Sequence, residues 1–241
     1  MKVLIIILGL LSHFSIYAAS VKQKDLNFTV KGEELLNGDV YYSVEVLTKK
    51  QLAKILPAFV ELDTSGFTKA KNAELLVSKT SYVVRKPVGF FDHDKIVNED
   101  FLNHYFGEQK VTKTEDRTFK VRIPGSTPQT YKLRTHFDSD DISTTTNSRA
   151  IRAITGAKKM DIQVQGAQSI IMKEMWDFSR GSYGAVHVTA YIGLKEDRTL
   201  VIDFGIMSLI PPLLARETLD ESIIGEAKAH QELLNSFKGV R

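Results

Sequence analysis

The sequence predicts an α+β domain, with a curved antiparallel sheet covered by one long C-terminal helix and a cleaved signal peptide in front. Three observations carry this prediction. Stretches of alternating apolar and polar residues, typical of half-buried strands, recur over residues 40–210. They are followed by one long stretch with apolar residues at helical spacing, residues 218–238. The chain opens with residues 1–20, which have the three parts of an export signal.

The N-terminal segment predicts export. Lys2 supplies the positive charge, residues 3–11 form the apolar core, and residues 18–20 are the small residues that a signal peptidase requires. Polar residues interrupt the apolar run after Leu11, whereas a membrane span takes about 20 apolar residues. We therefore expect cleavage within residues 18–21 and a mature protein that is periplasmic or secreted.

Composition indicates a single soluble domain over residues 21–241. Of the 241 residues 43% are hydrophobic, which is enough for a core of ordinary size. The absence of cysteine excludes a disulfide-stapled scaffold and a lipid-modified N-terminal cysteine. The formal net charge is +3, and removal of Lys2 with the signal lowers it to +2, so nucleic acid is not an expected partner. Oligomeric state is left open.

The first half of the domain mixes strands and helices. Residues 40–46 alternate like a strand. Residues 48–60 predict a helix that opens with a capping box and is kinked or divided at Pro57. Residues 73–85 predict a second strand. Asn98 is a typical N-cap residue, and it precedes a short apolar helix that ends near Gly107.

The second half is predicted to be mostly strand. The expected strands are residues 119–123, 131–137, 160–164, 169–178, 185–194 and 200–210, with a helical turn at 148–154. A second capping box, Thr218 to Glu221, opens the terminal helix. The apolar seam of that helix is Ile223, Ala227, His230, Leu234 and Phe237. His230 is expected to be a hydrogen-bonded core residue.

The hairpin over residues 185–210 has two different faces. A three-residue loop centred on Asp197 predicts that one face is wholly apolar, which the terminal helix would cover. The pairs on this face are Ile192 with Ile202, Ala190 with Phe204, and Val188 with Ile206. The other face carries His187, Thr189 and Tyr191 against Asp203, Gly205 and Met207, with Tyr191 opposite Asp203. This amphipathic face is suited to line a cavity.

We therefore expect a binding module for an apolar or amphipathic small molecule or lipid. Its candidate ligand-binding residues are Trp176, His187, Thr189, Tyr191, Asp203 and Phe204, or their opposite-face neighbours if the packing is reversed. The plain alternative is that these are half-exposed sheet residues with polar tips in water. A hydrolase with a His187–Asp203 site is a further alternative, but it needs a nucleophile that the sequence does not mark, since no Gly-x-Ser-x-Gly occurs.

A second candidate surface is a row of basic residues on two neighbouring strands. Its members are Lys120, Arg122, Lys132, Arg134 and His136. Like charges that face each other destabilise a strand pair, so a negative partner is expected nearby. The acids Glu115, Asp116, Asp138 and Asp140 are one source of that charge. An anionic partner or membrane surface is the other, and it would suit an envelope-associated protein-interaction module.

Metal and cofactor chemistry are not expected. Residues 92–94 and the acids that follow His136 are the only clusters of metal-ligand types, and neither has a recognised ligand spacing. No cofactor motif occurs, and no residue is assigned a catalytic role. An enzyme is therefore not the favoured interpretation.

The order of elements over about residues 40–237 resembles that of helix-grip domains of the START-like kind. That resemblance implies that the terminal helix, residues 218–238, lies across a curved sheet and encloses an apolar cavity. The chain departs from this pattern by an extra helix near residues 98–106 and a helical turn near Ser148. The same order would also suit an exported bacterial domain of unassigned function.

Overall fold

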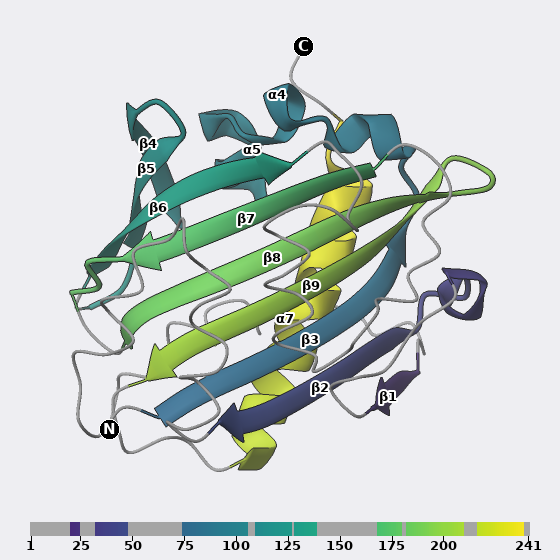
Figure 1. Ribbon diagram of the computed structural model, residues 1–241, viewed down its shortest axis with the longest axis horizontal. Helices are drawn as coiled ribbons and strands as arrows, with labels where there is room; N and C mark the ends of the chain where they lie inside the picture. Colours follow the sequence, from purple (N-terminus) through teal and green to yellow (C-terminus); the bar gives the residue numbers. More distant parts are fainter. Residues whose placement is uncertain are drawn as a thin grey trace.

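A nine-stranded sheet forms the centre of the molecule. The computed structural model describes residues 20–24, 32–47, 74–105, 109–126, 128–138, 168–179, 182–209 and 216–238. The strands lie in the order β1-β2-β3-β9-β8-β7-β6-β5-β4 (Figure 1). Their bounds are β1 Val21–Gln23, β2 Val40–Leu47, β3 Glu74–Val84, β4 Lys110–Glu115, β5 Thr118–Ile123, β6 Gln129–Asp138, β7 Gln168–Trp176, β8 Ser182–Leu194 and β9 Arg198–Leu209.

The sheet is antiparallel apart from one edge. Only β1 pairs parallel with its neighbour β2 among the described strand pairs. The described helices are η1 Gly32–Leu35, η3 Val88–Phe91, α4 His93–Ile96, α5 Glu99–Tyr105 and α7 Arg216–Ser236. The predicted α+β class, with a long terminal helix on an antiparallel sheet, is therefore confirmed.

Seven strands match their predictions, and two were missed. β1 has only three residues, and in β4 only Val111 is buried, so neither shows the alternation that predicts a strand. The predictions for residues 48–60, 148–154 and 160–164 lie outside the described residues. The same is true of the signal segment up to residue 19.

The predicted helix starts have different outcomes. Asn98 caps α5 as expected, because its Oδ1 accepts the backbone N–H of Phe101 at 2.8 Å. The terminal capping box is wrong: α7 begins at Arg216, so Thr218 lies inside the first turn and does not cap it. Arg216 and Glu217 are good helix formers, and they extend the helix ahead of the threonine.

Helix α7 crosses one face of the sheet (Figure 1), packing on β2 and β3. Of its predicted seam Ile223, Ala227, His230 and Leu234 are buried, and Phe237 is partly buried just beyond the helix. Toward its N-terminal half, Leu219 and Ile223 pack with Tyr42, Val44 and Leu76. Toward its C-terminal half, Ala227 and Leu234 join the larger core cluster.

Polar contacts also hold the C-terminal half of α7. Gln231 Nε2 donates to the carbonyl of Val83 at 2.8 Å, and Asn235 Oδ1 accepts the backbone N–H of Arg85 at 2.6 Å. These bonds tie the helix to the end of β3. Within the described residues no helix is both long and apolar enough to cross a membrane.

An aromatic group covers the same face of the sheet beside α7. Phe91 of η3 is fully buried and stacks on Tyr191 of β8, with ring centroids 4.3 Å apart and an interplanar angle of 10°. Phe90 and Phe101 each pack edge-on against Phe237, and their own rings are tilted relative to each other. The segment from η3 to α5 therefore closes the end of the sheet that α7 leaves uncovered.

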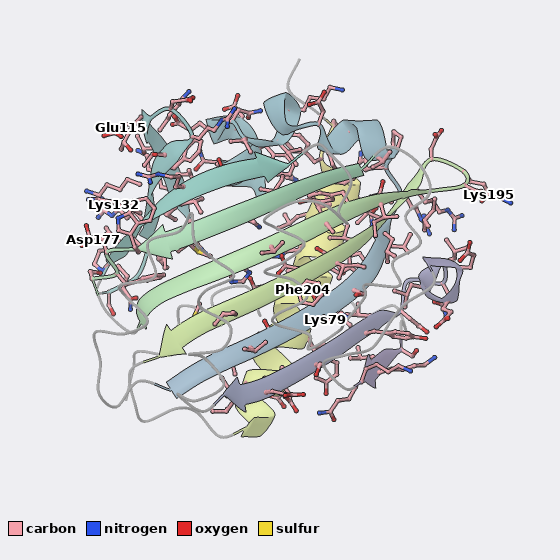
Figure 2. All side chains as sticks on the ribbon, viewed as in Figure 1. Lys79, Glu115, Lys132, Asp177, Lys195 and Phe204 are labelled. Carbon is pink, nitrogen blue, oxygen red and sulfur yellow. The ribbon has the colours of Figure 1, made fainter. Side chains whose placement is uncertain are left out.

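The opposite face of the central strands is buried too. Val77, Val188, Phe204 and Ile206 are at most 2% exposed. Lys79 lies among them with its Nζ 4.9 Å from the centre of the Phe204 ring. Burial lowers the pKa of Lys79 to about 8. Figure 2 shows Lys79 and Phe204 near the middle of the sheet, on the side away from α7.

Candidate functional site

A group of ionisable side chains lies where α7 crosses the middle of the sheet. β8 is the fifth of the nine strands, and it contributes His187 and Thr189. Its neighbours contribute Lys173, which is paired with His187, and Asp203, which is paired with Thr189. Residues that face each other directly across strands share one side of the sheet. We call these four residues, with Glu226 and His230 of α7, the polar cluster.

Asp203 is the best-connected member. Its Oδ2 lies 3.2 Å from Nδ1 of His187, and its Oδ1 accepts a hydrogen bond from the Thr189 hydroxyl at 2.5 Å. Burial by itself would raise the pKa of Asp203, but the hydrogen bond and positive charge of His187, then Lys173 and Thr189, lower it well below its usual range. Asp203 is therefore ionised, and the Nδ1 atom of His187 carries the proton that it accepts.

The helix contributes a carboxylate and an imidazole one turn apart. His230 Nε2 lies 4.0 Å from Oε1 of Glu226. Burial lowers the pKa of His230 to about 3, with a further contribution from the positive charge of Lys173. Burial also raises the pKa of Glu226. His230 is thus neutral at pH 7, as expected of a buried core histidine.

Lys173 adds the buried cation of the cluster. The residue is 6% exposed, and burial lowers its pKa, although Asp203 and Glu226 act in the opposite direction. A buried ammonium is retained only where negative groups compensate its lost hydration. The cluster supplies these groups, so Lys173, Asp203 and Glu226 form one electrostatic unit.

Water reaches this cluster although it lies in the middle of the sheet. The side chains of His187 and Asp203 keep 17% and 18% of their surface exposed, and that of Glu226 keeps 37%. Their apolar neighbours are closed: Tyr191 is 2% exposed and Val201 is fully buried. The sheet and α7 therefore do not seal against each other at the polar side chains.

Four of the six predicted ligand residues come together. His187, Thr189 and Asp203 belong to the polar cluster, and Tyr191 lies beside it on the same face. Phe204 is directly opposite Val188, on the other face, and Trp176 is opposite Lys132, also on the other face. A single cavity wall of all six residues is therefore wrong.

The prediction for the helix cover is also wrong. The three-residue loop is centred on Glu196, one place earlier than expected, so Thr189 and not Tyr191 opposes Asp203. This shift moves each partner by two residues and leaves the faces unchanged. α7 packs on the face of His187 and Tyr191, and the wholly apolar face of the hairpin is turned away from it.

Three residues near the site were missed by sequence reasoning. Lys173 lies between Ile171 and Met175 on the same face of the strand. A lysine at an otherwise apolar position was the signal that could have identified it. Glu226 lies one turn before His230 on the helix, a pairing that was also readable. Ser78 of β3, which lies across Gly205 from His187, gave no signal, because strands far apart in the sequence bring it there.

The basic residues lie on the exposed face of the sheet, away from α7. Lys120 directly opposes Lys132, and Arg122 opposes Lys110, so the predicted like-charge juxtaposition is real. Lys132 pairs with Asp177 at 3.1 Å, and the Arg134 guanidinium lies 5.2 Å from the centre of the Trp176 ring (Lys132 and Asp177 in Figure 2). We call Lys110, Lys120, Arg122, Lys132 and Arg134 the basic row.

Among the described side chains, the acid that pairs with the basic row is Asp177, which was not predicted. Asp177 follows β7 and reaches Lys132, whereas Glu115 and Asp116 lie at the β4–β5 turn. The backbone of His136 and Asp138 belongs to β6, but their side chains, like residue 140, lie outside the described part. Much of the positive charge of the basic row is therefore left facing solvent.

Comparisons with other proteins match the fold but not the sequence. No protein-family model matches the chain, and no curated protein is significantly similar to it. A START superfamily protein from Mycobacterium smegmatis superposes with a TM-score of 0.44 at 8% identity, over 66% of this chain and 96% of that chain. The Zhui aromatase/cyclase from Streptomyces sp. R1128 gives 0.44 at 9% identity, over 67% and 92%.

A norcoclaurine synthase from Thalictrum flavum gives a TM-score of 0.41 at 12% identity, over 68% of this chain and 97% of that chain. The helix-grip arrangement expected from the element order is confirmed: a long terminal helix, α7, crosses one face of an antiparallel sheet. All three TM-scores lie below 0.5, so these similarities say nothing about the function of this chain.

Proposed function

We propose that the protein is exported and binds an amphipathic small molecule between its sheet and α7. The observation that carries the proposal is the partly exposed polar cluster at the centre of a face that is otherwise apolar. His187 and Asp203 are accessible there, while apolar clusters flank them on both sides. Ligand sites have this composition: mostly apolar walls with a few placed polar groups.

The cluster suits a ligand with a polar group that both donates and accepts hydrogen bonds. Asp203 and Glu226 offer acceptor oxygens, and Lys173 offers donors. The apolar remainder of the ligand would lie along either flank, toward Tyr191 or toward Leu76 and Ile223. Burial of such a chain stabilises the complex by about 0.8 kcal/mol for each CH₂ group.

Export is part of the same proposal and is supported by the N-terminal sequence. The described domain begins at Ser20, whose backbone N–H donates to Asp39 Oδ1 at 2.8 Å. The next residue, Val21, starts β1.

1-Dodecanol is a suitable probe of the ligand site, because its hydroxyl can donate to Asp203 and accept from Lys173. We expect delipidated protein to bind it with 1:1 stoichiometry in native mass spectrometry and calorimetry. Asp203→Asn and Lys173→Met should each weaken binding about tenfold or more, since a hydrogen bond to a charged group contributes about 1.5–3 kcal/mol. Lys120→Gln, on the opposite exposed face, is the matched control and should bind like the wild type. The proposal would be contradicted if mass spectrometry showed only the bare protein at every probe concentration. It would also be contradicted if both cluster variants bound the probe with unchanged affinity.

The basic row supports a second candidate function, association with an anionic surface. Lys120 opposite Lys132 is unfavourable without a negative partner, and Asp177 pairs with only one of them. We expect the protein to sediment with vesicles that contain phosphatidylglycerol at low salt and to be released as salt rises.

Replacing Lys120, Arg122, Lys132 and Arg134 by Gln should abolish this sedimentation. The matched control removes four other exposed lysines, Lys24, Lys95, Lys195 and Lys238. Equal loss in both quadruple variants would show a general charge effect and would refute a role for the basic row.

A further inference from the structure

Ser78, Gly205 and His187 lie side by side on three neighbouring central strands, with the glycine between the other two. Gly205 of β9 is paired with Ser78 of β3 on one side and with His187 of β8 on the other. All three residues therefore share the face that α7 covers. Lys173 of β7, paired with His187, extends the same row.

The missing side chain of Gly205 lets its two neighbours approach each other. A Cβ atom built on Gly205 would lie 2.9 Å from Ser78 Oγ and 3.2 Å from His187 Nε2, so these two atoms are at most about 6 Å apart. Both side chains thus lean over the glycine into the same space. Any larger residue at position 205 would separate them.

The two ring nitrogens of His187 have different surroundings. Nδ1 faces Oδ2 of Asp203, and the Thr189 hydroxyl donates a hydrogen bond to the other carboxylate oxygen, Oδ1. Because the ionised Asp203 faces Nδ1, Nε2 is the ring nitrogen on the side of Gly205, and it is the atom placed to take a proton from Ser78. A serine, a histidine oriented by a carboxylate, and access for water are the parts of a nucleophilic triad.

We propose that Ser78, His187 and Asp203 form such a triad and hydrolyse an ester of an amphipathic molecule held beneath α7. Ser78 Oγ attacks the ester carbonyl carbon, and its proton passes to His187 Nε2. The carbon–oxygen bond to the alcohol then breaks, and the alcohol leaves with that proton. Water, activated by His187, next cleaves the acyl–serine bond, which releases the acid and restores Ser78.

The geometry needs a modest closure before the first step. Nucleophile and base work at a separation of about 3 Å, and apo sites are commonly looser. A change of rotamer moves the Ser78 Oγ by about 2 Å, which covers most of this gap. Lys173 lies next to His187 on the side away from Ser78, so its positive charge favours the ionised state of Asp203.

The proposal is tested with p-nitrophenyl octanoate and with diisopropyl fluorophosphate, which phosphorylates activated serines. We expect the wild type to turn over the ester and to gain one phosphoryl group on the peptide that contains Ser78. Ser78→Ala and His187→Ala should each lower turnover about 1,000-fold and abolish labelling. Gly205→Ala should do the same by placing a methyl group between the two side chains.

Ser81→Ala is the matched control. Ser81 is on the same strand three residues away, faces the other side of the sheet and is fully buried. Its removal should leave turnover and labelling unchanged. Far-ultraviolet circular dichroism and thermal unfolding show which variants are folded, and Ser78→Ala, a loss of one oxygen, is expected to be among them.

The result separates this proposal from ligand binding. Wild-type protein that binds 1-dodecanol but neither hydrolyses the ester nor becomes labelled overturns the triad and leaves the binding function standing. Labelling that persists in Ser78→Ala also overturns it. Loss of turnover in Ser78→Ala, with the affinity for 1-dodecanol retained, supports both proposals.

Discussion

Lowering the pH from 7 to 4 is expected to reduce the free energy of unfolding by about 3 kcal/mol through His230 alone. Its pKa is about 3 in the folded protein, against an ordinary value of 6.5. The unfolded chain therefore takes up a proton near pH 6.5 that the folded protein takes up only near pH 3. Stability from this group is complete above pH 6.5 and is lost as the pH falls toward 3.

Urea unfolding at several pH values measures the effect. In His230→Gln the loss between pH 7 and pH 4 should be smaller by about 3 kcal/mol than in the wild type. Glu226 acts in the opposite direction, because its raised pKa makes the folded state bind a proton first. Because Glu226 is present in both the wild type and His230→Gln, its contribution cancels when the two proteins are compared.

His104→Gln is the control for acid unfolding. The His104 ring contacts α7 outside the polar cluster, with Nε2 2.9 Å from the carbonyl oxygen of Leu233. The acid loss should persist in this variant. An equal acid loss in His230→Gln and in the wild type would refute the assignment to His230.

Phe91→Ala is expected to cost about 3–5 kcal/mol of unfolding free energy. The ring is fully buried and stacks on Tyr191, so truncation leaves a cavity and also removes an aromatic pair. Tyr191 lies beside the polar cluster, and loss of its partner ring should also weaken binding of 1-dodecanol.

Gly89→Ala tests whether the cost belongs to this ring. Gly89 lies in the same short helix, η3, and an added Cβ there meets nothing within 4 Å. Its effect should stay within about 0.5 kcal/mol. A Phe91→Ala cost below about 1 kcal/mol in urea unfolding would show that η3 does not anchor this end of the sheet.

The local pattern of the chain was sufficient for most elements. Alternation of period two identified most strands. It also assigned His187, Thr189 and Asp203 to one face, and this assignment survived the error in register, because a shift of two residues keeps every side chain on the same face. The capping role of Asn98 was readable for the same local reason, since its partner Phe101 is three residues away. These features depend on neighbours in sequence.

The sequence by itself therefore determined seven of the nine described strands, the terminal helix and the two faces of the hairpin. Only the tertiary structure decided which face α7 covers, because both faces of β8 and β9 carry enough apolar surface to be buried. It also decided that Ser78 lies beside the polar cluster. Ser78, Gly205 and His187 meet through non-local strand pairing, which local periodicity does not encode.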